Sequence, residues 1–152
     1  MLKIEIICVS RLKKGAYAEL IEDYKKRIRW DLKIHEIEAR NTDPQKAQQE
    51  ESEKILKYLS TQAIVFALDE RGNGLKSLYF AKTLEKFKNT GETHIQFIIG
   101  GADGLTDEVR GRANILHSFG QQTWPHLMAR VMLLEQIYRA QQILIGHPYH
   151  RE

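Results

Sequence analysis

The last six residues of the chain, HPYHRE, concentrate side chains that could do chemistry. His147, Tyr149, His150 and Arg151 place two imidazoles, a phenol and a guanidinium in one short segment. An imidazole can take up a proton near neutral pH, and a guanidinium can stabilise a developing negative charge. A single histidine near a terminus usually has no role, but this group follows directly on a long helical pattern. The tail is therefore a candidate catalytic segment.

A second set of candidates is rich in glycine and follows strand-like apolar runs. The segments are 68–72 (LDERG), 99–104 (IGGADG) and 119–124 (FGQQTW). Ligands of parallel α/β sheets bind outside the carboxyl ends of the strands, where glycines leave backbone groups accessible. A single glycine more often only makes a turn, and neither a dinucleotide-binding nor a P-loop spacing is present. Asp69 either binds the ligand or caps its own loop.

Alternating strands and helices must position these segments. Apolar runs predict strands over 2–9, 32–38, 63–69, 94–100 and 115–119. Helical spacing and capping residues predict helices over 16–29, from Asp43 to Leu59, from Ser77, from Thr106 to Arg112, and over 125–145, with a loop over 70–76. Strands separated by such helices indicate βαβ units. The predicted fold class is α/β, with a mainly parallel sheet flanked by helices.

Length and composition limit the protein classes that fit. The 152 residues suit a single domain over 1–152, and 42% hydrophobic with 28% charged residues is typical of soluble proteins. No apolar run approaches the roughly 20 residues that span a bilayer, and we expect a cytoplasmic protein without a membrane partner. Cys8, the single cysteine, fits a reducing compartment. The net charge of +3 permits a nucleic-acid partner without requiring one.

The final helix is apolar on nearly all sides over 127–134, which predicts burial on more than one side and hence a homodimer. Glu135 and Arg139 are spaced for an ion pair within the helix. A helix of about 20 residues carries the tail roughly 30 Å from the glycine-rich edge. An antiparallel partner could therefore deliver its tail to that edge. His126, at the start of the helix, either acts beside the pocket or caps and packs.

The motifs LDERG, FIIGGADGL, TWPHLMARVMLLEQIYRA and HPYHRE together resemble the small SPOUT-class methyltransferases of the ribosomal large-subunit methyltransferase H family. The resemblance covers the whole chain. It implies a C-terminal trefoil knot, which the usual preference for unknotted connections would not predict. It also implies a homodimer that uses S-adenosylmethionine, without a metal, to methylate N3 of a pseudouridine in 23S rRNA. Because the chain is small and has no added RNA-binding domain, we expect it to act on assembled 70S ribosomes.

The resemblance also implies site residues. The cofactor positions are Leu68, Gly100, Phe119, Gly120, Gln121, Gln122, Thr123 and Trp124, and the catalytic and RNA-facing positions are His126, Tyr149, His150 and Arg151. Either His150 or His126 would take the N3 proton, Arg151 would stabilise the anion, and Tyr149 would orient the base. One alternative is a non-catalytic ribosome- or RNA-binding module that retains the fold. Another is a flavodoxin-like protein, although SRLKKGAYA is a poor match to the loop of hydroxyl residues and glycines that cradles a flavin phosphate.

Overall fold

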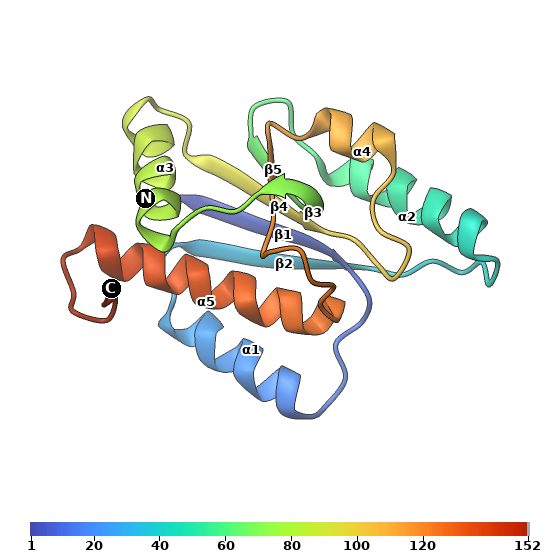
Figure 1. Ribbon diagram of the computed structural model, residues 1–152, viewed down its shortest axis with the longest axis horizontal. Coiled ribbons are helices and arrows are strands. Elements are labelled where there is room, and N and C mark those ends of the chain that lie inside the picture. The colour runs from blue at the N-terminus through green and yellow to red at the C-terminus, as the bar shows by residue number, and fades with distance from the viewer. Residues whose placement is uncertain (152) are drawn as a thin grey trace.

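Five parallel strands lie between two layers of helices in the computed structural model, which describes residues 1–151 (Figure 1). In chain order the elements are β1 (Lys3–Val9), α1 (Ala16–Arg27), β2 (Asp31–Ile37), α2 (Pro44–Tyr58), β3 (Ile64–Asn73), α3 (Ser77–Asn89), β4 (His94–Ile99), α4 (Asp107–Arg112), β5 (Ile115–His117) and α5 (His126–Leu144). The strand order is β2-β1-β4-β3-β5. The predicted parallel α/β architecture is confirmed.

The position of each strand follows from its apolar content. β4 (HIQFII) is buried along almost its whole length and occupies the centre, paired with β1 on one side and β3 on the other. β2 (DLKIHEI) alternates polar and apolar residues and forms one edge. A strand buried on both faces needs a nearly continuous apolar run, whereas an edge strand tolerates polar positions. Parallel pairing brings the carboxyl ends of all five strands to one edge of the sheet.

Each face of the sheet has its own core. Helices α1, α3 and α5 cover one face, where Phe66 and Phe97 pack with ring centroids 4.9 Å apart beneath Phe80 of α3. Helices α2 and α4 cover the other face, where Ile55 and Val109 are buried against the sheet. The two layers leave the carboxyl edge to loops, and this is the edge on which the glycine-rich segments were predicted to meet.

The predicted helix caps are confirmed at two of three positions. The Asp43 carboxylate accepts a hydrogen bond from Lys46 N at 3.0 Å, and the Thr106 hydroxyl accepts one from Val109 N at 3.3 Å. Ser77 was predicted as a cap, which is wrong. Lys76 holds the cap position without a side-chain bond, and Ser77 Oγ instead donates to Gln136 Oε1 of α5 at 2.7 Å. A tertiary partner thus replaces the local capping bond.

The predicted loop over 70–76 is also partly wrong, because β3 continues to Asn73 through a register irregularity. Gly72 permits this continuation. A Cβ atom there would lie 2.5 Å from the carbonyl carbon and oxygen of Leu116, so only glycine lets the two backbones approach so closely. β5 is correspondingly shorter than predicted and ends at His117. The end of β3 therefore reaches further toward the ligand edge than its apolar run suggested.

Candidate active site

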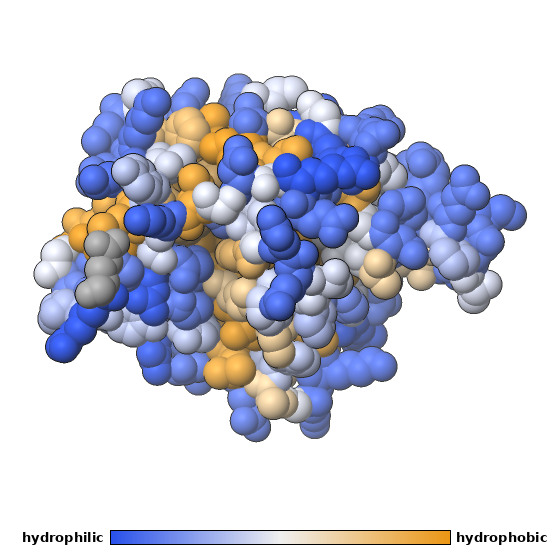
Figure 2. All heavy atoms as spheres, viewed as in Figure 1, coloured by the Kyte–Doolittle hydropathy of each residue, from blue (hydrophilic) through white to orange (hydrophobic). Residues whose placement is uncertain are grey.

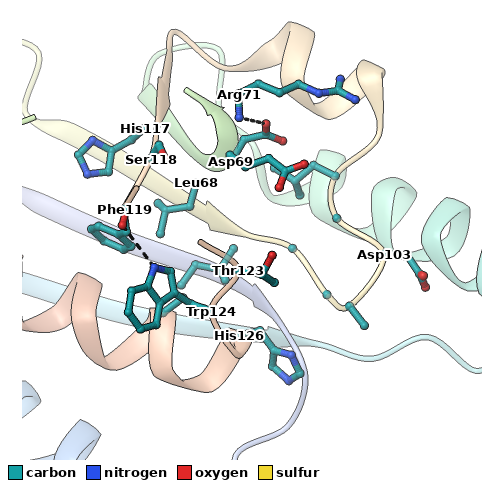
Figure 3. A pocket seen from close by; sticks show the side chains of 18 of the residues that line it. Leu68, Asp69, Arg71, Asp103, His117, Ser118, Phe119, Thr123, Trp124 and His126 are labelled. Carbon is teal, nitrogen blue, oxygen red and sulfur yellow. Dashed lines mark hydrogen bonds between the residues drawn. The ribbon is translucent and has the colours of Figure 1, made fainter. Parts of the chain in front are cut away.

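A cavity of about 820 Å³ opens at the carboxyl ends of β3, β4 and β5 (Figure 3). Its lining includes 68–71, 99–105, 117–120, 122–126, Gln48, Arg110 and Ala129. The three glycine-rich segments predicted to meet at this edge all contribute to the wall. The size lies within the range of about 300–1,000 Å³ found for small-molecule sites. The predicted ligand edge is therefore a real pocket.

The turn after β4 is held in shape from two sides. Gly104 N donates to Gly101 O at 3.0 Å, and Gly104 has a left-handed backbone with φ of 76°. Behind the turn, Gln48 of α2 donates from Nε2 to Asp103 O at 2.8 Å. The hydroxyls of Ser52 and Thr106, 2.8 Å apart, add a second link between α2 and the turn. The glycine-rich wall is therefore braced by α2, so its backbone groups keep their orientation.

Asp69 caps its own loop, one of the two roles left open by the sequence, and it also lines the cavity. Its side chain is only 7% exposed and accepts a hydrogen bond from Arg71 N at 2.9 Å, the contact dashed in Figure 3. It also accepts one from Arg110 Nη1 at 3.2 Å, and Arg110 donates to Leu105 O as well. Arg110 thus joins the end of β3 to the glycine-rich turn. Sequence reasoning missed this residue, although it follows that turn on α4.

The segment after β5 folds on itself. Gly120 N donates to Ser118 Oγ at 3.1 Å, and Trp124 Nε1 donates to Phe119 O at 3.3 Å (Figure 3). Gly120 has φ of 109°, and no atom lies within 4 Å of the point where a Cβ would stand. The backbone of this segment is consequently ordered by its own contacts while open space remains beside it. Gln121 is the one predicted cofactor position that does not line the cavity.

His117 is a second residue that sequence reasoning missed. It ends β5, is almost fully buried, and packs edge-on to Phe119 with centroids 5.2 Å apart. Burial lowers the pKa of its imidazole. Within residues 1–151 its Nδ1 atom has no hydrogen-bond partner. A neutral, uncharged imidazole therefore stands in the cavity wall, and only its place at the end of a strand could have indicated it.

His126 lies on the cavity wall, as predicted from its position at the start of α5. Pro125 holds the N-cap position of α5, so His126 does not have the capping role considered for it. Burial, and to a lesser degree the positive charge of Arg130, lower the pKa of His126. The imidazole is therefore neutral near physiological pH and can accept a proton.

Beneath His126, an ion pair between the buried Arg130 and the partly exposed Glu36 ties α5 to the ends of β1 and β2. Arg130 is 1% exposed, and its Nη1 lies 2.8 Å from Glu36 Oε2 while its Nη2 donates to Ser10 O at 2.9 Å. The same Glu36 oxygen accepts a hydrogen bond from Leu12 N at 2.6 Å. Burial alone would raise the pKa of Glu36, but these partners outweigh burial and lower it. The pair fixes the first turns of α5 relative to the sheet.

The tail lies at the far end of α5 from the cavity (Figure 1). With 19 residues at about 1.5 Å each, α5 separates the two by roughly 27 Å. The tail folds against the last turns of the helix, where the Tyr149 ring lies 4.8 Å from the Tyr138 ring and His150 Nδ1 lies 3.0 Å from Arg139 Nη1. The predicted pair of Glu135 and Arg139 is confirmed, with 2.6 Å between Oε1 and Nε.

The structure therefore divides the predicted site residues into two groups. It brings His126 together with all the predicted cofactor positions except Gln121, and it leaves Tyr149, His150 and Arg151 away from this cavity within the same chain. Across residues 1–151, no three His, Cys, Asp or Glu side chains are grouped so as to hold a metal ion. None of the helices in that range combines the length and apolarity needed to cross a membrane.

Comparison with known proteins places the chain in a family. A family model described as "Predicted SPOUT methyltransferase" matches residues 2–150. A protein of Rhodospirillum centenum named "Ribosomal RNA large subunit methyltransferase H" is 45% identical over 151 residues, covering 99% of each chain. A protein of the same name from Bradyrhizobium diazoefficiens is 45% identical over 159 residues, again covering 99% of each.

A solved structure supports the fold. A probable methylase family protein from Haemophilus influenzae matches 100% of this chain and 72% of its own with a TM-score of 0.60, at 14% identity. The α/β knot predicted from the resemblance agrees with this neighbour and with the family model. The chain therefore belongs to the SPOUT methyltransferases and, among them, to the ribosomal RNA large subunit methyltransferase H family.

Proposed function

We propose that the protein transfers the methyl group of S-adenosylmethionine to N3 of a pseudouridine in 23S rRNA of the assembled 70S ribosome. The observation that carries the proposal is the pocket formed by the three glycine-rich segments, in a chain that shares its full length with proteins named ribosomal RNA large subunit methyltransferase H. Membership of the family supports the reaction class. The small size of the chain supports a substrate whose surroundings complete the binding surface.

The pocket fits S-adenosylmethionine. Leu68 and Phe119 offer apolar walls for a flat purine ring, and the backbones at Gly100 and Gly120 offer hydrogen-bonding groups. The open space beside Gly120 leaves room for a ligand to approach its backbone. When bound, S-adenosylmethionine supplies an electrophilic methyl carbon. The chain's contribution is then to align the pseudouridine N3 with that carbon and to remove the N3 proton.

Two histidines could hold the proton that leaves N3. His126 lies on the wall and is kept neutral by burial, so one of its ring nitrogens can accept the proton directly. His150 Nδ1 faces the Arg139 guanidinium, which can only donate, so Nδ1 is the acceptor and the ring proton sits on Nε2. His150 must therefore leave Arg139 before it can accept a proton from a base. Arg151 would stabilise the anion, and Tyr149 would orient the ring.

We further propose a homodimer that supplies the tail of one chain to the pocket of the other. A second hollow of about 650 Å³ lies between α3 and α5, lined largely by apolar groups that include Leu75, Phe80, Val131 and Met132. Tyr79, also on α3, is 60% exposed. Figure 2 shows hydrophobic atoms in a broken band that runs from beside α3 across the middle of α5, between hydrophilic atoms on either side. A second copy would cover this face and, if antiparallel, would bring its own tail toward the cavity.

The testing experiment measures labelled methyl transfer from S-adenosylmethionine to 70S ribosomes that lack the modification, with nucleoside mapping of the product. Label on N3 of one pseudouridine supports the proposal, and no label from folded protein contradicts it. Equal activity on naked 23S rRNA would contradict the 70S assignment. His150→Ala is expected to lower turnover and leave the Kd for S-adenosylmethionine nearly unchanged. A large loss of cofactor binding would reject the tail's catalytic role.

The arrangement of the tail can be tested by mixing inactive variants. His126→Ala and His150→Ala protomers, each expected to have lowered turnover alone, would form mixed dimers in which one composite site has both histidines. Activity recovered on mixing supports a tail that acts across the dimer. No recovery, with dimer exchange shown by light scattering of size-tagged chains, would place both histidines in the site of one chain.

A further inference from the structure

We infer that the β1–α1 loop, residues 10–15 (SRLKKG), is a phosphate-binding edge that holds the ribosomal RNA beside the methyl-transfer cavity. The inference rests on the proposed function and adds to it a surface and a mode of substrate recognition. It arises from three features of the loop: its place next to the cavity, its uncompensated positive charge, and the buried pair that fixes its backbone.

The loop lies at the same edge of the sheet as the cavity. β1 pairs with β4, and at their carboxyl ends Val9 contacts the glycine turn, where its Cγ1 atom would lie 2.9 Å from a Cβ on Gly101. The loop follows directly, and Ser10 O is bonded to Arg130, one turn beyond His126 on α5. Figure 1 shows the loop at the end of the molecule where α5 begins. RNA whose base enters the cavity therefore passes close to it.

Positive charge on this loop is exposed and uncompensated. Arg11, Lys13 and Lys14 are all exposed, and within residues 1–151 no ion pair links either lysine to a carboxylate. Glu36 attracts Arg11, but its carboxylate is already bonded to Arg130 and to Leu12 N. Three cations in four residues therefore remain available to an external anion.

Two basic residues of α1, unlike the lysines of the loop, have carboxylate partners. Lys25 lies 3.2 Å from Glu22, and Arg27 lies 3.0 Å from Asp23, so these charges are partly balanced within the helix. Lys25 and Arg27 are therefore less available to an external anion than the cations of the loop.

The backbone of the first half of the loop, over 10–12, is fixed before any partner binds. Ser10 N donates to Ile37 O at 2.8 Å, and Ser10 adopts an uncommon φ of 98° while Arg130 holds its carbonyl. Leu12 N is bonded to Glu36 at 2.6 Å. A loop ordered in advance loses less conformational entropy on binding. Lysine and arginine side chains on such a scaffold suit the phosphate backbone of RNA, which dominates the affinity of nucleic-acid complexes.

The test compares two charge-matched variants of the full chain. Lys13→Gln/Lys14→Gln neutralises the loop, and Lys86→Gln/Lys88→Gln neutralises the C-terminal end of α3, at the opposite edge of the sheet. The Kd for vacant 70S ribosomes is measured at several salt concentrations, together with the Kd for S-adenosylmethionine. The loop variant is expected to bind ribosomes about tenfold more weakly, with the slope of log K against log salt reduced by about 1.4–1.8. The Kd for S-adenosylmethionine should not change.

The control variant should match the wild type in all three measurements. Equal ribosome affinity and equal salt slopes for the loop and control variants would overturn the inference while leaving methyl transfer by the wild type intact. Failure of the proposed function looks different, because the wild type itself would then transfer no methyl group to 70S ribosomes. Lys13→Glu/Lys14→Glu extends the test, since charge reversal must weaken ribosome binding further than neutralisation does.

Discussion

Breaking the buried pair of Arg130 and Glu36 should expose how strongly it holds the first turns of α5. Glu36→Ala leaves the Arg130 charge buried with only Ser10 O as a partner. Removing one partner of a buried pair costs about 3–5 kcal/mol, and since the Glu36 side chain is 33% exposed, we expect about 2–3 kcal/mol here. That loss corresponds to a fall in Tm of about 4–12 °C for a domain of this size.

A double-mutant cycle measures the coupling free energy between Arg130 and Glu36 apart from their other contacts. Arg130→Met alone removes the buried charge, and Glu36 is exposed enough to be solvated, so the double variant should be more stable than the sum of the two single changes predicts. We expect a coupling of about 1–2 kcal/mol, measured by urea unfolding. The exposed Glu38→Ala serves as a control, with an effect within about 0.5 kcal/mol. Additive losses for the two single variants would refute the argument that the charges depend on each other.

Three further predictions concern stability and reactivity. Gly72→Ala should lower the free energy of unfolding by about 1–3 kcal/mol, because its Cβ would meet the β5 backbone at 2.5 Å, whereas Gly74→Ala meets only an ordinary contact at 3.8 Å. Burial by itself would raise the pKa of Glu5, but hydrogen bonds with His94 and His35 outweigh burial and lower this pKa. The ionised carboxylate therefore stabilises the fold above its ordinary pKa of 4.5, and this stability is lost as the pH falls through the lower folded pKa. Acid titrations monitored by circular dichroism should show a flatter decline for Glu5→Gln. Burial also raises the pKa of the Cys8 thiol to about 11, so alkylation by iodoacetamide at pH 8 should be slow until urea unfolds the chain. Rapid labelling of the native protein would contradict the buried position of this thiol.

The strands were predicted well where burial alone decides the structure. The continuous apolar runs 63–69 and 94–100 correspond to β3 and β4, and β4 is the central strand of the sheet with β3 beside it. The errors occur where a distant partner overrides a local preference. Ser77 bonds to Gln136 across to α5, and the extension of β3 depends on contact between Gly72 and β5. Neither contact can be predicted from the pattern of neighbouring residues in the sequence.

The candidate site likewise has features that the sequence predicts and features that it does not. Glycines after apolar runs were enough to predict a pocket at the carboxyl edge, because the rule depends only on the parallel sheet. Arg110 and Arg130 escaped prediction because Asp69 and Glu36, the carboxylates that tie them to the ends of β3 and β2, lie 41 and 94 residues away in the chain. The knot and the identity of the cofactor came from the family resemblance, which no pattern of hydrophobic residues could replace. The roles of the tail residues stay predictions.

The central place of β4 in the sheet delays the completion of the sheet while the protein is being synthesised on a ribosome. β1 is synthesised early and can pair with β2, but its other edge waits for β4, whose residues lie about 90 positions later. At about 5–20 residues per second, this leaves the edge open for on the order of ten seconds. During that interval Ile4, Ile6 and Ile7, fully buried in the finished fold, have no complete cover. The nascent chain should therefore be a client of chaperones that bind exposed apolar strands until residues 94–99 have emerged.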